Sequence, residues 1–180
     1  MNFSELLARS ARVSVLGAAI CGVLAGAATP AAAVTRTTKT FGKWTVTCND
    51  NDQGARNCAL TQSLSSAAAA NAPQRMVFAL TVAGTKDKPR LIGVVPIGVS
   101  LPDGLTLNFG DGQPLALAYN VCAPRVCIAN AALDAKVLAA LKGSTKVLAN
   151  YVLANKKLIQ VNVDTASFGD AYAYLASQQK

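Results

Sequence analysis

Residues 105–131, LTLNFGDGQPLALAYNVCAPRVCIANA, contain the pattern that decides the fold. Apolar and polar side chains alternate through residues 105–109, which is typical of a β-strand with one buried face. The tripeptide Gly110-Asp111-Gly112 then favours a tight turn, because glycine accepts a positive φ. Residues 115–122 return as a second strand, and residues 127–131 form a third after a short turn between two cysteines. The stretch therefore predicts three successive antiparallel strands.

The same period of two recurs in most of the sequence beyond residue 43. Further strands are expected over residues 44–48, 76–82, 91–95, 145–152 and 157–163. Two short helices are also predicted, one that Asp134 caps and that runs to Lys142, and one that Ser167 caps. The alanine-rich stretch 65–73 is expected to be a loop or a frayed helical turn. Together these elements predict a mainly β protein, a single antiparallel β-sandwich-like domain with one or two short helices.

Residues 1–33 have the three parts of a secretory signal peptide. A segment with two arginines precedes an apolar stretch over residues 13–28, and a run of small residues suited to signal peptidase follows. The apolar stretch of about 16 residues is shorter than the roughly 20 that span a bilayer. We therefore expect cleavage after Ala33 and export by the general secretory route. Residues 34–180 would then form the folded domain, located in the periplasm or at the outer surface.

Four cysteines remain once the signal peptide, which contains Cys21, is removed: Cys48, Cys58, Cys122 and Cys127. An even number in an exported chain indicates two disulfides. Of the three possible pairings we prefer the local one, because the residues between each pair are typical of turns. Each bridge would stabilise the fold by roughly 2–3 kcal/mol. The alternatives are a redox site, although C-x4-C is not the C-x-x-C motif, and a zinc site, although the spacing is not that of a zinc ribbon.

Residue types that commonly carry catalysis are scarce. The sequence has no histidine, and its only glutamate is Glu5, so imidazole-dependent hydrolysis is excluded. No nucleotide-binding glycine motif occurs. The polar cluster at 49–52 lacks the glutamate of a calcium loop and is interpreted as a solvated turn. We expect no catalytic residue, no cofactor and no metal, while an aspartate-based hydrolase and a small-molecule carrier remain alternatives.

The chain is basic, with 17 lysines and arginines against nine acidic residues and a formal charge of +8. Lys86, Lys88 and Arg90 surround one expected turn, and Lys156 and Lys157 lie in another. If both turns share one end of the domain, they form a patch that attracts anionic lipid headgroups or glycans. The alternative is that these charges only maintain solubility and protect strand edges. Nucleic acid is the less favoured partner, given the expected export and the few aromatic residues.

Four longer motifs follow one another along the chain. They are FGKWTVTC at 41–48, CALTQ at 58–62, VPIGVSLPDGL at 95–105 and CAPRVC at 122–127. In this order and spacing they resemble the invasion-associated locus B family of exported proteins from Gram-negative bacteria. The resemblance extends from about Phe41 to Leu175 and implies a periplasmic or surface-associated β protein with paired cysteines and no established activity or cofactor. We therefore expect a non-enzymatic protein that binds an envelope or host-surface partner through a disulfide-stapled scaffold.

Overall fold

The structure is a computed structural model that describes residues 35–179, apart from residues 52, 67–72 and 111. The expected signal peptide, residues 1–33, lies outside the described residues, as does most of the alanine-rich stretch 65–73. The described part contains ten strands and two helices. In chain order these are β1 (Arg36–Phe41), β2 (Trp44–Asp50), β3 (Arg56–Ser65), β4 (Met76–Thr85), β5 (Lys88–Pro96), β6 (Leu105–Asn108), β7 (Leu115–Cys122), β8 (Val126–Ala132), α1 (Ala135–Gly143), β9 (Lys146–Val152), β10 (Leu158–Asp164) and α2 (Phe168–Gln178).

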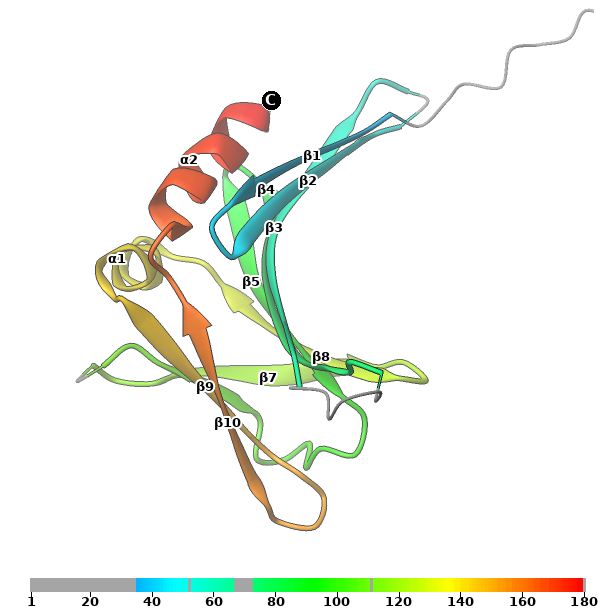
Figure 1. Cartoon of the computed structure of the whole chain (residues 1–180), viewed down its shortest axis with the longest axis vertical. Helices are drawn as coiled ribbons and strands as arrows, with labels where there is room; N and C mark the ends of the chain where they lie inside the picture. Colours follow the sequence, from blue (N-terminus) through cyan, green and yellow to red (C-terminus); the bar gives the residue numbers. More distant parts are fainter. Residues whose placement is uncertain (1–34, 52, 67–72, 111, 180) are drawn as a thin grey trace, which may run out of the picture. The chain divides into compact units, whose positions relative to one another are not determined.

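The strands form one continuous sheet in the order β1-β2-β3-β4-β5-β8-β7-β6-β9-β10, and every neighbouring pair is antiparallel. Figure 1 shows that this sheet curls into a half-barrel. The mainly β, antiparallel class with two short helices is confirmed. The two layers expected of a sandwich are two arms of a single sheet, because β7 pairs with β8 in one arm and with β6 in the other.

Two of the ten strands are not predicted by the sequence patterns. The side chains of β1 are exposed along nearly its whole length, so this polar edge strand carries no alternating apolar signal. In β3 a glutamine occupies a buried position, and Gln62 therefore interrupts the apolar face that would have marked the strand. The other predicted strands and both helices occur close to their expected positions.

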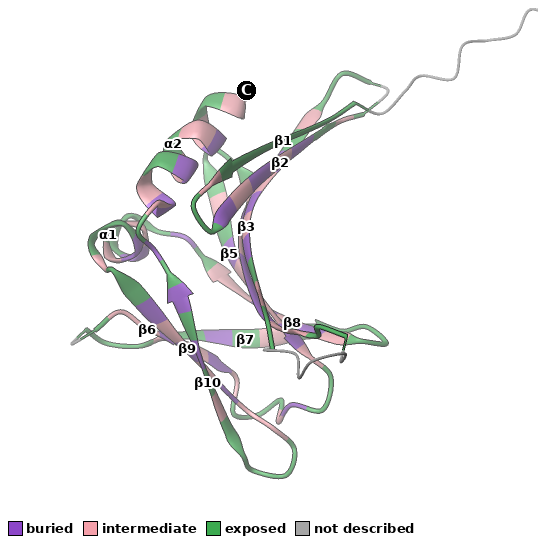
Figure 2. Cartoon of the chain, viewed as in Figure 1, coloured by how far each residue is buried: buried purple, intermediate pink, exposed green. Residues whose placement is uncertain are grey.

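The core lies on the inner face of the curled sheet, where buried residues from both arms meet (Figure 2). Trp44, Phe78 and Phe168 are the largest fully buried side chains. Helix α2 packs over β2 and β3, and the ring of Phe168 meets that of Trp44 edge-on at 5.1 Å between centroids. Removing this apolar surface from water is the main stabilising contribution to the fold.

Buried polar contacts tie the end of β10 to the opposite arm. The side chain of Gln62 donates to the backbone oxygen of Asp164 at 2.7 Å and accepts from its backbone nitrogen at 3.0 Å. The indole Nε1 of Trp44 donates to the same oxygen at 2.8 Å. Gln62 is only 3% exposed, so its amide group depends on these bonds in place of contacts with water. They fix the position of β10 against β2 and β3, which are far from it in the strand order.

The two helices begin differently. The side chain of Asp134 accepts from the backbone nitrogen of Val137 at 2.8 Å, which confirms the predicted cap of α1. Ser167 occupies the N-cap position of α2, but its side chain makes no capping bond. The expected cap is wrong in that respect, because Ser167 has φ −105° and ψ 12° rather than the extended conformation of a capping residue. Among the described residues, no helix combines the length and apolar character needed to cross a membrane.

Two partly buried tyrosines, Tyr119 in β7 and Tyr151 in β9, lead us to expect lower stability at alkaline pH. Burial, and secondarily the neighbouring Tyr151, raises the pKa of Tyr119 from 10.0 to about 12, and burial also raises the pKa of Tyr151. The unfolded phenols lose their protons first, so the free energy of unfolding should fall as the pH rises from about 10 to about 12. Urea unfolding at several pH values measures this loss. Tyr119→Phe should show a smaller decrease, and an identical decrease would contradict the assignment to Tyr119.

Candidate functional site

Both disulfides lie across the ends of β-hairpins. Cys48 and Cys58 are opposite each other in β2 and β3, with sulfurs 2.04 Å apart. Cys122 and Cys127 are opposite each other in β7 and β8, with sulfurs 2.07 Å apart. The structure thus has the local pairing that the sequence favours. Each bridge fixes the two strands just before the turn that connects them, so the geometry of that turn is constrained.

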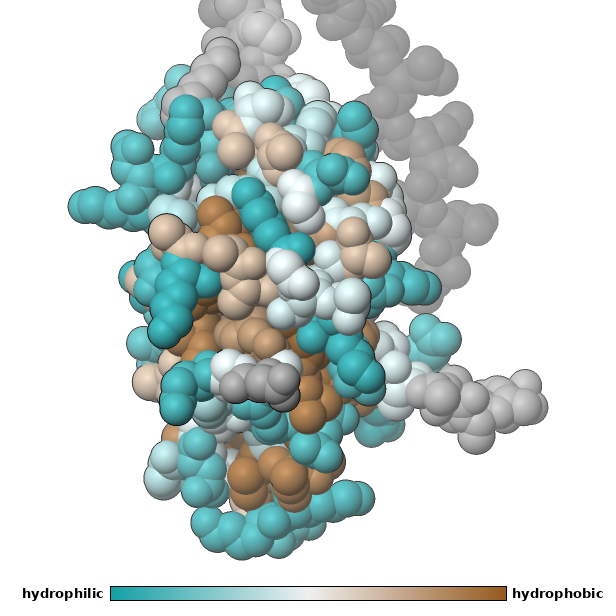
Figure 3. Space-filling model, turned by 90° about the vertical axis from the view of Figure 1, so that its left-hand side faces the viewer, coloured by the Kyte–Doolittle hydropathy of each residue, from teal (hydrophilic) through white to brown (hydrophobic). Residues whose placement is uncertain are grey.

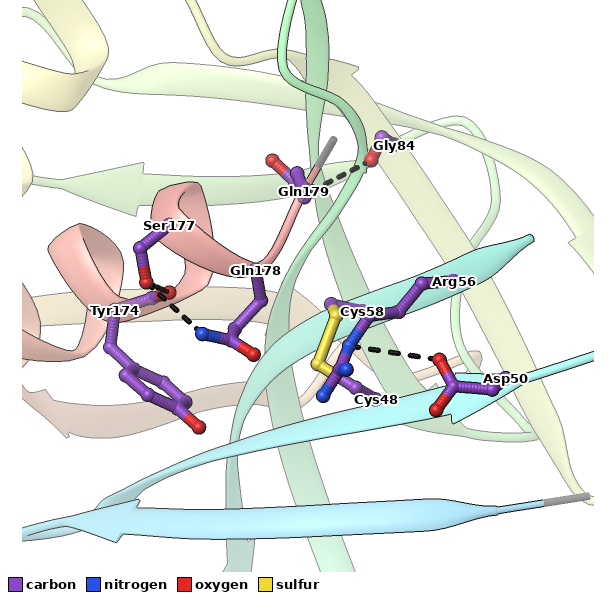
Figure 4. The surroundings of a disulfide bond; sticks show 9 residues. All are labelled: Cys48, Asp50, Arg56, Cys58, Gly84, Tyr174, Ser177, Gln178 and Gln179. Carbon is purple, nitrogen blue, oxygen red and sulfur yellow. Dashed lines mark hydrogen bonds and ion pairs between the residues drawn. A yellow bond between two sulfur atoms is a disulfide. The ribbon is translucent and has the colours of Figure 1, made fainter. Parts of the chain in front are cut away.

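The first disulfide lies beside an ion pair and the C-terminal end of α2 (Figure 4). Arg56 Nε is 3.7 Å from Asp50 Oδ1, and Gln179 Nε2 donates to the backbone oxygen of Gly84 at 2.8 Å. In the connecting turn, Asn51 Oδ1 accepts from the backbone nitrogens of Gln53 and Ala55. Both hydrogen bonds are exposed, in agreement with the interpretation of this polar cluster as a solvated turn.

The five basic residues expected to form one patch lie at opposite ends of the sheet. Lys86 and Lys88 belong to the β4–β5 turn, beside the end of α2, and Arg90 contacts the side chain of Asn130 in β8. Lys156 and Lys157 lie at the β9–β10 tip, next to Gly98, which follows the other end of β5. Because β5 has nine residues, it separates the two turns by about 30 Å. The prediction of a single basic patch is therefore wrong, because the curled sheet places the two hairpin turns at different ends.

A loop, a turn and a hairpin tip meet at the second of these ends. Ile97 N donates to Arg125 O at 3.2 Å, which connects the loop after β5 with the disulfide-closed β7–β8 turn. Ala154 N donates to Gly98 O at 2.8 Å, which connects the same loop with the β9–β10 tip. Gly98 has a φ of 93°, a conformation that side chains rarely adopt. We call this end of the molecule, formed by residues 97–104, 121–126 and 153–158, the loop end.

The loop end exposes apolar side chains. The described chain has four large hydrophobic side chains that are more than half exposed, and all four belong to the loop end. They are Ile97 (54%), Leu101 (53%), Val121 (55%) and Leu158 (53%). A cleft of about 620 Å³ lies beside Ile97, between Met76 and Pro96 on one side and the β7–β8 turn on the other. Single exposed hydrophobic residues are ordinary, but the gathering of all four at one end of the molecule is typical of an interaction surface.

Basic side chains surround these apolar groups. Arg75 and Arg125 line the cleft, and among the described residues neither has an acidic partner within 4.0 Å. Lys156 Nζ is 3.3 Å from Asp103 Oδ2. Hydrogen bonds from Ser100 and Lys156 lower the pKa of Asp103. Arg125, Lys156 and Lys157 in the loop end, together with Arg75 across the cleft, give four basic groups against the one acid Asp103, so the charge of these five residues is 4 − 1 = +3.

The sequence did not identify most of the loop end. Only Lys156 and Lys157 were candidate contact residues, whereas Ile97, Leu101 and Arg125 were seen only within motifs. Residues 97 and 125 are distant in sequence, and the period-two pattern contains no information on how loops meet in space. An available signal was the presence of Ile97 and Leu101 in a loop rich in proline and glycine, where apolar side chains have no strand face to cover.

Several aspartates have structural roles. Asp50 pairs with Arg56, Asp134 caps α1, and the side chain of Asp164 accepts from the backbone nitrogen of Ala166 at 2.9 Å. Within the described residues, no three side chains among histidine, cysteine, aspartate and glutamate come together as a metal site would require.

Comparison with known proteins agrees with the sequence motifs. The family model of the Invasion associated locus B (IalB) protein matches residues 44–176. The invasion protein B homologues of Brucella abortus strain 2308 and of Brucella abortus biovar 1 strain 9-941 are each 30% identical to this chain over 136 residues, which cover 74% of it and 75% of the relative. The crystal structure of invasion associated protein b from Bartonella henselae shares the fold, with a TM-score of 0.66 and 21% identity over 78% of this chain and 95% of that one. The chain belongs to the invasion associated locus B family.

Proposed function

We propose that this protein is an exported, non-enzymatic binding protein that uses the loop end to recognise a partner in the bacterial envelope or on a host surface. The observation that carries the proposal is the convergence of apolar and basic side chains on one end of a disulfide-stapled sheet. Two of the four family motifs, residues 95–105 and 122–127, meet there through the bond between Ile97 and Arg125. The names of the relatives, invasion protein B homologues, are compatible with a host surface as one location of the partner.

The scaffold supports such a role because it limits the motion of the binding loops. The Cys122–Cys127 bridge closes the turn that carries Arg125, and backbone bonds attach the loop of residues 97–104 to both neighbouring hairpins. A surface that is already ordered loses less conformational entropy on binding than a mobile one. The loop end therefore needs little further ordering when it binds a partner.

Site-specific crosslinking in the native envelope tests the proposal. A photoreactive residue in place of Leu101 should capture a defined partner, whereas one in place of Lys88, at the opposite end, should not. The two positions form a matched pair, since both are exposed and both lie next to turns. Mass spectrometry of the captured protein should also give an N-terminus near Val34. Equal capture from both positions, no capture from Leu101, or a retained N-terminal segment would each contradict the proposal.

A further inference from the structure

We infer that the loop end docks the protein on the surface of an anionic lipid bilayer. This inference rests on the proposed function and specifies the chemistry of the partner. Its first support is the distribution of apolar exposure, because Ile97 and Leu101 in the loop after β5 and Leu158 at the start of β10 are exposed on adjoining segments rather than lining an enclosed pocket. Figure 3 shows hydrophobic side chains exposed at the lower end of the molecule, directly above a hydrophilic tip. Side chains of this kind insert into the boundary between headgroups and acyl chains.

The second support is charge complementarity. Arg75, Arg125, Lys156 and Lys157 surround the apolar residues, and Asp103 is the only acid in the three loops. Basic side chains near a membrane surface strengthen binding to anionic lipids by roughly fivefold each at moderate salt. The β4–β5 turn provides a comparison within the same molecule. Lys86 and Lys88 give it positive charge, but it has none of the four exposed large hydrophobic side chains.

The third support is the backbone of Lys156. Its φ of 66° is positive, and among the described residues it is the one non-glycine residue with this conformation. Glycine or asparagine would fit this position of the hairpin with less strain. Lys156 N donates to Leu153 O at 2.8 Å, so the tight turn is formed by the backbone and does not depend on the lysine side chain. The β9–β10 tip therefore has a lysine, with its positive charge, at a position where the backbone conformation favours glycine.

Vesicle sedimentation tests the inference with the exported protein. Vesicles of phosphatidylcholine and phosphatidylglycerol in equal parts should bind it at least about tenfold more tightly than vesicles of phosphatidylcholine alone, and added salt should weaken the binding. Combining Lys156→Gly with Lys157→Gln should weaken binding about tenfold or more. The matched control, Lys86→Gln with Lys88→Gln, removes the same charge from the opposite end and should change binding less than about twofold. Equal effects of the two pairs would overturn the assignment to the loop end.

A second set of variants tests the apolar contribution. Replacing Ile97, Leu101 and Leu158 by serine should weaken binding about tenfold or more, while the fold should be retained because all three side chains are more than half exposed. Leu101→Trp should show blue-shifted emission on vesicle binding, against the constant background of the buried Trp44. Unchanged binding of the serine variant, or an unshifted emission, would overturn insertion of these loops.

The outcomes for the inference and for the proposed function are distinguishable. If Leu101 crosslinks to a protein or glycan in the envelope but the protein does not bind anionic vesicles at low salt, the lipid inference fails and the proposed function stands. Binding to a soluble polyanion without binding to vesicles would likewise overturn the lipid inference. If neither envelope partner nor vesicle is bound through the loop end, both fail.

Discussion

Replacing Gln62 by leucine should lower the free energy of unfolding by about 3 kcal/mol. The substitution preserves much of the side-chain volume but removes both hydrogen bonds to the backbone of Asp164. Each lost bond costs about 1 kcal/mol, and the backbone nitrogen of Asp164, which is only partly shielded from water, loses its partner at a further cost of about 1 kcal/mol. The backbone oxygen keeps its bond to Trp44, so the loss is smaller than complete separation of β10 from the opposite arm would give.

Urea unfolding measures this effect through the midpoint and the slope. The matched control is Gln160→Leu, because Gln160 is exposed on β10 and its side chain bonds only to that of Asn150, at 3.2 Å. That variant should change the free energy of unfolding by less than about 0.5 kcal/mol. If Gln62→Leu were as stable as Gln160→Leu, the two hydrogen bonds would not hold the arms of the sheet together.

Much of the fold could be predicted from local patterns. Alternation of apolar residues identified most strands, and Asp134 marked the start of α1, because each of these signals acts over a few neighbouring residues. The closure of the sheet could not be predicted in this way. It depends on contact between Gln62 and the backbone of Asp164, which are 102 residues apart, and the polar side chain of Gln62 would ordinarily be placed in solvent.

The candidate site was predictable only in part for the same reason. The cysteine turns were identified because the number of cysteines and their short spacings restrict the pairing. The basic residues were identified by type, but their grouping required the path of β5, which carries Lys88 at one end and leads to Gly98 beyond the other. Exposure of Ile97 and Leu101 depends on how three loops meet, and no single stretch of sequence contains that information.

The second large effect is expected at Gly93 in β5, which lies against Leu105 of β6 in the other arm of the sheet. A Cβ atom at this position would overlap Cδ2 of Leu105 in β6 and lie 3.6 Å from the ring of Phe78. Both neighbours are fully buried, so neither can move into solvent to relieve the overlap. Gly93→Ala should therefore lower the free energy of unfolding by about 3 kcal/mol, as overpacking of a dense core does.

The control for Gly93→Ala is another glycine-to-alanine substitution, for which we expect an increase in the free energy of unfolding. Gly169→Ala lies in helix α2, where a Cβ atom meets nothing within 4 Å, and it should raise the free energy of unfolding by about 0.5–1 kcal/mol because alanine favours the helix. A double-mutant cycle with Leu105→Ala tests the mechanism. Removing the Leu105 side chain creates space for the new methyl group, so the double variant should be more stable than the sum of the two single losses predicts. Strict additivity would mean that Gly93 is required for a reason other than contact with Leu105 across the curled sheet.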